Sequence, residues 1–167
     1  MKKIIIVLLG ATVVFSSCRR ASSVNDLNQA FLDSLVEKPL SDIGYVLSVP
    51  AGYSITETRG EDFSVFYFDR SDSTIASAFS GGVYFGNHPG SFPPANDSCK
   101  VESLSSVILG TNATWTKHKC SEEYSIQTIV ASDSDEGWNA KVHAFGHAKS
   151  ETGIAKVLAI YRTLRKK

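Results

Sequence analysis

The stretch DFSVFYFD, residues 62–69, decides the fold class of this chain. In an extended strand Phe63 and Tyr67 share one face, and Phe66 and Phe68 share the other, because successive side chains alternate between the faces. A strand that is apolar on both faces is typically covered on both faces. We therefore expect this segment to be a central strand of a sheet within a packed core.

Further strands are expected on both sides of this segment, because short runs of β-branched and aromatic residues alternate with turn residues. Pro50 and the pair Ala51-Gly52 separate two runs that precede it. After it, Gly81-Gly82 falls inside a third run, which indicates a bulge or a close approach of another backbone. The strands expected in addition to 63–69 span residues 45–49, 53–58, 75–85, 114–120, 122–131 and 138–145.

A helix is expected at each end of the domain. Residues 23–37 carry apolar side chains at helical spacing, Ser23 is a good N-cap, and Pro39 would stop the helix. Residues 150–165 place a second apolar stripe at helical spacing. Together these elements predict an α+β domain, in which an antiparallel meandering sheet packs with an N-terminal and a C-terminal helix.

Three segments together resemble a known group of domains. They are SVPAGY at 48–53, DFSVFYF at 62–68 and AKVLAIYRTLR at 155–165. The chain is similar in this respect to the PsbP-like α/β-sandwich lipoproteins, in which a similar strand-turn opens the domain and a similar helix ends it. The resemblance covers most of the chain after its leader. It implies a binding or accessory module, and it brings no catalytic residues to this sequence.

The N-terminus has the pattern of an export signal. Two lysines precede an apolar stretch at 4–15, which is shorter than the roughly 20 residues of a membrane span. Two serines and Cys18 follow, and this order resembles the lipobox of bacterial lipoproteins, in which the cysteine is lipidated and becomes the mature N-terminus. A plain secreted protein and a retained anchor helix are the alternatives.

The leader divides the chain into three parts. We expect a signal peptide at 1–17, a lipidated N-terminus with a short tether at 18–23, and a single domain at 24–167. Each acyl methylene buried in the membrane would stabilise the attachment by about 0.8 kcal/mol. No aspartate follows Cys18, which favours the outer membrane, on its periplasmic side, in bacteria that sort lipoproteins by that residue.

Charge and cysteine content narrow the partners. Lys and Arg together number 17, as do Asp and Glu, so the chain lacks the basic excess typical of nucleic-acid binding, and we expect no such partner.

After Cys18 only Cys99 and Cys120 remain, and in an exported protein this pair is most simply one disulfide. Two free thiols or a metal pair are the alternatives.

The stretch NHPGSFPPANDSC at 87–99 is the candidate binding loop. Pro89-Gly90 fits the centre of a type II turn with positive φ at Gly90, and Pro93-Pro94 is stiff and extended. Long ordered loops often carry binding residues, although a structural crossover is an equal alternative here. The residues expected to contact a protein partner are Asn87, His88 and Phe92.

Motifs of known catalysis are missing from the sequence. It has no nucleophile elbow, zinc-protease helix or phosphate loop, so we expect neither an enzyme nor a bound cofactor. Gly146 is expected to end its strand and so to separate His143 from His147, and we expect no metal site. We predict a lipid-anchored envelope module that engages a protein partner. The alternatives are a small-ligand carrier with an apolar pocket between the sheet and the terminal helix, and an envelope enzyme that uses His88.

Overall fold

The computed structural model describes residues 29–72, 74, 76–121, 123–132 and 137–167. Cys18 and the expected leader lie outside these residues. The elements in chain order are α1 (Gln29–Asp33), β1 (Leu35–Leu40), β2 (Tyr45–Pro50), β3 (Tyr53–Arg59), β4 (Phe63–Arg70), β5 (Phe79–Gly86), β6 (Lys100–Ile108), β7 (Thr111–Cys120), β8 (Glu123–Ala131), β9 (Lys141–Ala148), α2 (Glu151–Tyr161) and β10 (Arg165–Lys166).

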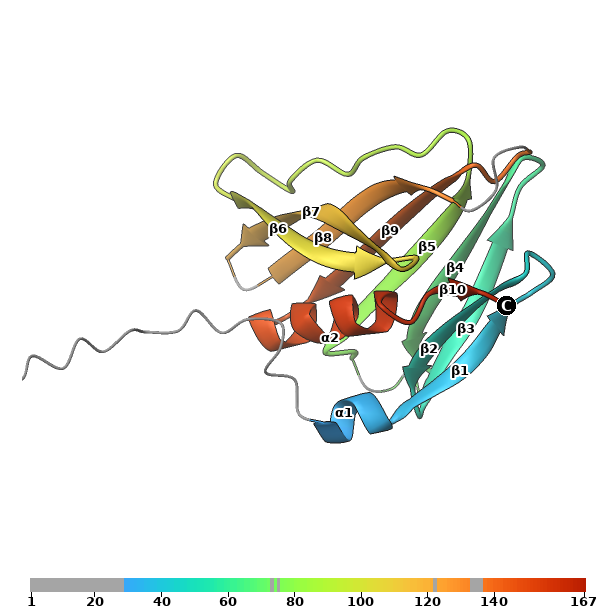
Figure 1. Cartoon of the computed structure of the whole chain (residues 1–167). Helices are drawn as coiled ribbons and strands as arrows, with labels where there is room; N and C mark the ends of the chain where they lie inside the picture. Colours follow the sequence, from blue (N-terminus) through green and yellow to red (C-terminus); the bar gives the residue numbers. More distant parts are fainter. Residues whose placement is uncertain (1–28, 73, 75, 122, 133–136) are drawn as a thin grey trace, which may run out of the picture.

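The strands form two antiparallel sheets. The large sheet has seven strands in the order β3-β4-β5-β9-β8-β7-β6, and the small sheet has the order β1-β2-β10. Helix α2 and the small sheet lie on the same face of the large sheet, which we call the inner face (Figure 1). We call the opposite face the outer face. The long connection between β5 and β6 places Phe92 on this face, against His143 and Phe145. The predominantly antiparallel α+β class is thus confirmed.

The core lies between the inner face, α2 and the small sheet. Tyr161 of α2 stacks on Trp115 of β7, with ring centroids 5.3 Å apart, and meets Phe68 of β4 edge-on at 5.8 Å. Tyr45 of the small sheet contacts Phe85 of β5 at 4.9 Å. Burial of aromatic side chains is the largest single source of apolar contact area, so these contacts fix α2 and the small sheet against the large sheet.

Strand β4 is an interior strand, as the sequence predicts, but its two faces differ. Phe66 and Phe68 point to the inner face and are buried, whereas Tyr67 points to the outer face and is 42% exposed. The prediction that both faces are covered therefore holds at Val65, which is buried on the outer face, and is wrong at Tyr67. The outer face has no packed layer over Tyr67, and this makes it available for contacts with another molecule.

The predicted helix over residues 23–37 is not observed. Residues 23–28 lie outside the described part of the chain, α1 is confined to Gln29–Asp33, and residues 35–37 belong to β1. Strand β1 pairs with β2 along its whole length, and this pairing outweighs the local helical spacing. Pro39 does not end a helix. It lies within β1, an edge strand, where a missing N–H is tolerated.

Helix α2 begins as predicted and ends early. The hydroxyl of Ser150 accepts the N–H of Gly153 at 3.1 Å and caps the helix. The helix ends at Tyr161, because the chain then turns so that β10 can pair with β2. Leu164, predicted to be on the helix, is buried in the core from this final segment instead.

Strand boundaries and close approaches complete the fold. The strands predicted at 114–120 and 122–131 correspond to β7 and β8. The strand predicted from residue 75 begins only at Phe79, as β5, and the sequence does not predict β6. Strand β9 runs through Gly146 to Ala148, so Gly146 does not end it. A Cβ at Gly146 would lie 2.6 Å from Cγ1 of Val157. Glycine is needed here because α2 packs directly on the strand.

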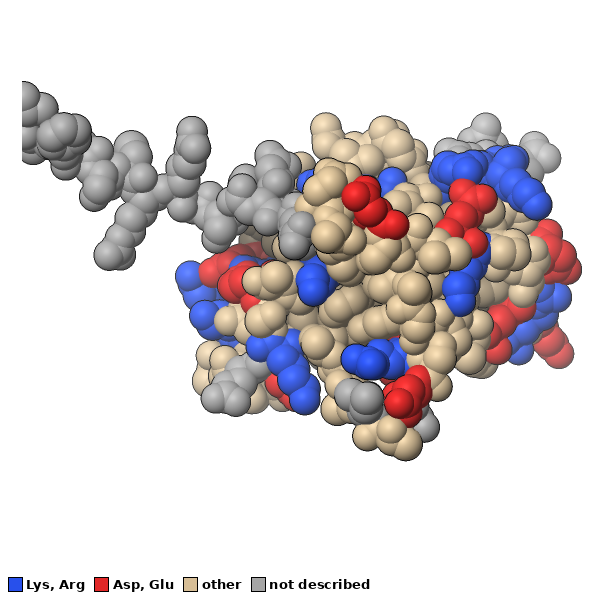
Figure 2. Space-filling view, turned by 90° about the horizontal axis from the view of Figure 1, so that it is seen from below, with Lys and Arg blue, Asp and Glu red and all other residues tan. Residues whose placement is uncertain are grey.

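The surface gives two further observations. Within the described residues, no helix has the length and apolar character to cross a membrane. Acidic and basic side chains are interspersed on the face shown in Figure 2 and do not gather into a region of one sign. That face therefore offers no single-sign field to attract a strongly charged polymer.

Candidate functional site

An aromatic surface covers the middle of the outer face. In the register of the large sheet, Val65 lies opposite Tyr84, Tyr84 opposite His143, and His143 opposite Ile129. The adjacent row brings Tyr67, Gly82 and Phe145 together in the same way. We call this surface, together with the loop residue that lies on it, the outer-face patch: Val65, Tyr67, Tyr84, Phe92, Ile129, His143 and Phe145.

Contacts between rings make the patch continuous. Phe92 lies 5.0 Å from His143 and 5.1 Å from Phe145, measured between ring centroids, and the Phe145 contact is edge-to-face. Tyr67 meets Phe145 at 6.0 Å from the other side. Phe92 is 47% exposed and Ile129 is 42% exposed. Large apolar side chains therefore remain in water although they are held in defined positions by their neighbours.

One glutamine of the sheet holds the loop on this surface. Oε1 of Gln127 accepts the N–H of Phe92 at 2.8 Å, and Nε2 donates to the Phe92 carbonyl. The same Oε1 lies 3.1 Å from Nε2 of His143, and because Oε1 can only accept, that ring nitrogen carries the proton. Burial lowers the pKa of His143, which favours the neutral ring. The loop is thus fixed at its middle.

The far end of the loop is fixed by the predicted disulfide. Cys99 and Cys120 are bonded, with an S–S distance of 2.03 Å and a Cα–Cα distance of 4.4 Å. The bond joins the end of the loop to the last residue of β7. His118 is buried on the same face of β7, and its Nδ1 lies 3.4 Å from the hydroxyl of Ser125. The loop is a fixed part of the outer face.

The structure brings only one of the three predicted contact residues into the patch, and that is Phe92. Asn87 is exposed, but its side chain donates to the carbonyl of Gly137 at 3.0 Å and accepts the N–H of Ala140 at 3.2 Å. The ring of His88 is exposed, and its backbone N–H donates to the hydroxyl of Tyr84 at 3.2 Å. Gly90 does not have a positive φ, so the predicted type II turn is wrong.

Two shallow clefts lie beside Phe92. One is about 230 Å³ and is lined mainly by rings of the patch, including Tyr67, Tyr84 and Phe145. The other is about 160 Å³ and lies between the loop and β8, beside Tyr124 and His147. Both are smaller than the roughly 300–1,000 Å³ of pockets that enclose small ligands. They suit single side chains of a partner better than a buried ligand.

A second site lies at one end of the large sheet, where three turns meet. We call it the polar cleft. It has a volume of about 410 Å³. Its lining residues come from the β1–β2 turn, the β3–β4 turn with its flanking strand ends, and the segment before β9: Asp42, Ile43, Arg59, Gly60, Glu61, Phe63, Ser64, Trp138 and Asn139. Sequence reasoning missed this site, because its residues are distant in the chain.

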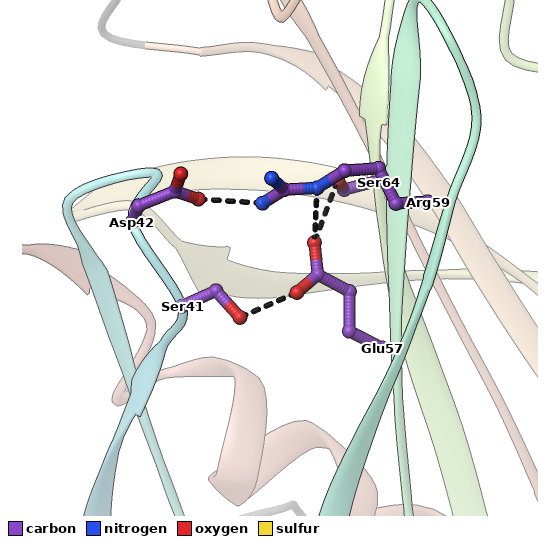
Figure 3. Close-up of polar contacts among 5 residues, drawn as sticks. All are labelled: Ser41, Asp42, Glu57, Arg59 and Ser64. Carbon is purple, nitrogen blue, oxygen red and sulfur yellow. Dashed lines mark hydrogen bonds and ion pairs between the residues drawn. The ribbon is translucent and has the colours of Figure 1, made fainter.

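Arg59 organises the charges at the polar cleft (Figure 3). Its Nη2 lies 2.5 Å from Asp42, and its Nε lies 2.9 Å from Oε1 of Glu57. Glu57 also accepts hydrogen bonds from the hydroxyls of Ser41 and Ser64. The Arg59 guanidinium lowers the pKa of Asp42, and the Ser41 hydrogen bond is the main cause that lowers the pKa of Glu57. Both carboxyls are therefore ionised at neutral pH, which does not suit a proton donor in catalysis.

The histidines of the outer face do not assemble a metal centre. Because β9 continues through Gly146, His143 and His147 share the outer face, contrary to the prediction. His147 lies opposite Ser125, and Ser125 lies opposite His118. Across the described ranges, no group of three His, Cys, Asp or Glu side chains is placed to hold a metal ion.

Comparison with known proteins gives no relative of this chain: no family model, no curated protein and no solved structure matches it. Function is therefore inferred from the outer-face patch and the polar cleft themselves. The patch is aromatic and fixed, and Tyr67, Phe92 and Ile129 are its exposed members. The cleft is polar, charged and concave.

Proposed function

We propose that this chain is a lipid-anchored binding or accessory module of the bacterial cell envelope that engages a protein partner and catalyses no reaction. One observation carries the proposal: the outer-face patch leaves Tyr67, Phe92 and Ile129 between 42% and 47% exposed on a single surface. Aromatic residues at the centre of protein interfaces account for much of their binding energy. A patch of this composition is typical of a surface that another protein covers.

The rigidity of the patch supports the same function. The ladder of the large sheet fixes the backbone of its strand residues. Ring contacts hold the side chains of Tyr67, Phe92 and Phe145, and Gln127 fixes the backbone of Phe92. Ordering a flexible side chain on binding costs about 0.5–1.5 kcal/mol. Because these side chains are already ordered by their neighbours, a partner that covers them would lose little conformational entropy.

The proposed location rests on the leader and on the disulfide. The order of residues before Cys18 resembles the lipobox of bacterial lipoproteins, with Phe15 in place of the usual leucine. The bond between Cys99 and Cys120 supports export, since disulfides persist in oxidising compartments such as the periplasm. Attachment to the outer membrane on its periplasmic side would present the patch to other proteins of the envelope.

The two alternative functions have less support. A ligand carrier would need an apolar pocket between the sheet and the terminal helix, whereas Val157, Leu158 and Ile160 of α2 are buried in the packed core. An enzyme that uses His88 would need this side chain in a polar pocket. His88 is not among the residues that line the three clefts described above.

Site-specific photo-crosslinking in native membranes tests the partner. A photoreactive residue at position Tyr67 or Ile129 should give an adduct of one defined mass. Val36, on β1, is 49% exposed and lies off the patch, so it is a matched control that should give no such adduct. The same adduct from all three positions, or none from the patch, would exclude the patch as the binding surface.

The anchor requires a separate measurement. The intact mass of the membrane-extracted protein should correspond to a chain that begins at Cys18 and carries acyl groups. In the Cys18→Ala variant this acylated species should be lost. An unacylated, soluble wild-type protein would contradict the anchor. The crosslinking experiment at Tyr67 tests the binding surface independently of this result.

A further inference from the structure

We propose that the polar cleft is a carbohydrate-binding site, separate from the outer-face patch and independent of the function proposed for it. The cleft is about 410 Å³, within the range of roughly 300–1,000 Å³ in which proteins bind small molecules. It is open to solvent, and polar side chains from three segments of the chain face it. These properties suit a hydrophilic ligand that remains partly exposed.

The cleft presents donors and acceptors side by side. Arg59 uses one N–H toward Asp42 and one toward Glu57, so three of its five N–H groups remain free to bind. The Trp138 indole N–H and the Glu61 carboxylate have no hydrogen-bond partner among the described residues. A sugar hydroxyl donates one hydrogen bond and accepts two, so vicinal hydroxyls can use both kinds of group.

The charges disfavour simple ions. An anion in the cleft would lie near the carboxylates of Asp42, Glu57 and Glu61, which outnumber the Arg59 guanidinium. A simple cation would lie beside Arg59 and would leave the free N–H donors unused. A neutral polyhydroxylated ligand avoids the repulsion by the carboxylates and also uses the N–H donors of Arg59. Its hydroxyls can donate hydrogen bonds to the carboxylates and accept them from the guanidinium.

An aromatic surface accompanies these polar groups. Trp138 is 39% exposed, and it lines the cleft together with the half-buried ring of Phe63. An indole ring offers an apolar face with a polar N–H at its edge. The C–H face of a pyranose ring can pack on such a surface while its hydroxyls reach the surrounding polar groups.

Asn87 holds the aromatic wall in place. Its side chain bridges the carbonyl of Gly137 and the N–H of Ala140, so it spans the two residues Trp138 and Asn139 that line the cleft. Arg59 is fixed in the same way by Asp42 and Glu57. The cleft is therefore ordered before a ligand arrives, and Asn87 acts as a positioning residue.

Binding can be followed with the full-length protein through Trp138 itself. Only two tryptophans are present in the sequence, and Trp115 is buried in the core, so iodide should quench mainly the emission of Trp138. The probes are chitotriose, cellotriose and maltotriose, with trilysine and citrate as a cationic and an anionic comparison. A trisaccharide should protect Trp138 from iodide and should show saturation transfer in ligand-observed NMR.

Variants then locate the site. Trp138→Ala and Glu61→Gln should each weaken the binding of the active trisaccharide about tenfold or more in NMR titrations, as expected for central contacts. Trp138→Phe should restore part of the affinity, and Asn87→Ala should weaken it. Val36→Ala, on β1 away from both sites, should leave it unchanged. Thermal melting checks that each variant is folded.

Two results would overturn the proposal. The first is a folded wild-type protein to which none of the three trisaccharides binds. The second is binding that Trp138→Ala leaves intact, or binding of trilysine or citrate alone, which would assign the cleft to an ionic ligand. Neither result depends on whether the outer-face patch binds a protein.

Discussion

The side-chain amide of Gln127 pairs with the backbone of Phe92 through both of its polar atoms. Oε1 accepts the Phe92 N–H at 2.8 Å, and Nε2 donates to the Phe92 carbonyl. A single side chain thus makes the two hydrogen bonds that a neighbouring strand would make. In this way the proline-rich loop is attached to the outer face although it forms no strand of its own.

Replacement of Gln127 by alanine should therefore release the middle of the loop. We expect faster hydrogen exchange of the Phe92 amide and earlier proteolytic cleavage within residues 87–99. The variant loses the two hydrogen bonds to Phe92 and leaves the N–H of His143 without its acceptor, so the free energy of unfolding should fall by about 1–3 kcal/mol. Exchange measured by mass spectrometry reports the first effect, and urea denaturation reports the second.

The matched control for this variant is Gln29→Ala. Gln29 also makes a side-chain hydrogen bond, to Asp33 at 2.8 Å, but on the exposed surface of α1. The Gln29→Ala variant should leave the hydrogen exchange of the Phe92 amide unchanged. It should change the free energy of unfolding by no more than a few tenths of a kcal/mol. Unchanged exchange at Phe92 in Gln127→Ala would mean that the loop is held by other contacts.

Loss of the disulfide should act on the far end of the same loop. Cys99 and Cys120 are separated by 21 positions. In the chain-entropy model a loop of this length contributes about 3 kcal/mol to stability. We expect Cys99→Ala/Cys120→Ala to lower the urea midpoint correspondingly, and dithiothreitol to lower the wild-type midpoint by a similar amount. A wild-type midpoint that is insensitive to reductant would contradict this contribution.

Several elements of the fold could be predicted because their signals are local. The aromatic run of β4 and the apolar stripe with its Ser150 cap in α2 each specify one element. β6 was missed, because serines at 103, 105 and 106 interrupt the alternation that identifies a strand. The helical spacing of residues 35–37 indicates a helix, and only their pairing with β2 makes them a strand.

The sites were harder to predict than the fold, because the residues that form them are far apart in the sequence. Phe92 was identified from its loop, and the sequence alone indicated that it would be displayed. The role of Asn87 depends on Gly137 and Ala140, which are about fifty positions away. The polar cleft depends on the meeting of three turns, and no motif joins Arg59 to Trp138. Side-chain partners that are brought together only by topology leave no signal in a single sequence.

Gly81 should be among the least replaceable residues of the sheet. A Cβ at this position would lie 2.6 Å from the carbonyl oxygen of Phe145 and 2.7 Å from the hydroxyl of Tyr161. Because the first contact is with backbone, relief requires the strands to move. We expect Gly81→Ala to cost about 1–3 kcal/mol of stability, as overpacked core substitutions do. Urea denaturation measures this cost.

Gly90→Ala is the matched control for that substitution. A Cβ at Gly90 would meet no atom within 4 Å, and its φ is not positive. Alanine should therefore be neutral or slightly stabilising there, since it reduces the freedom of the unfolded chain. Equal costs at Gly81 and Gly90 would show that the close approach at Gly81 is not the cause.

Tyr161 should make the fold sensitive to alkaline pH. Its single hydroxyl proton is shared between the carbonyl oxygens of Gly82, at 2.9 Å, and Phe145. Burial raises the pKa of the phenol above its ordinary value of 10.0. Above pH 10 the unfolded chain releases this proton while the folded chain retains it. Stability contributed by the neutral phenol is therefore present below pH 10 and falls by about 1.4 kcal/mol for each further pH unit.

Urea denaturation between pH 8 and 11.5 tests this dependence. Tyr161→Phe should be less stable than the wild type at pH 8 by about 1–2 kcal/mol, because two buried carbonyls lose their donor. Its stability should then decline less steeply above pH 10, so the difference between the two proteins should narrow as the pH rises. If Tyr161→Phe and the wild type decline in parallel, the alkaline sensitivity arises from other groups, and the buried hydroxyl contributes only its hydrogen bonds.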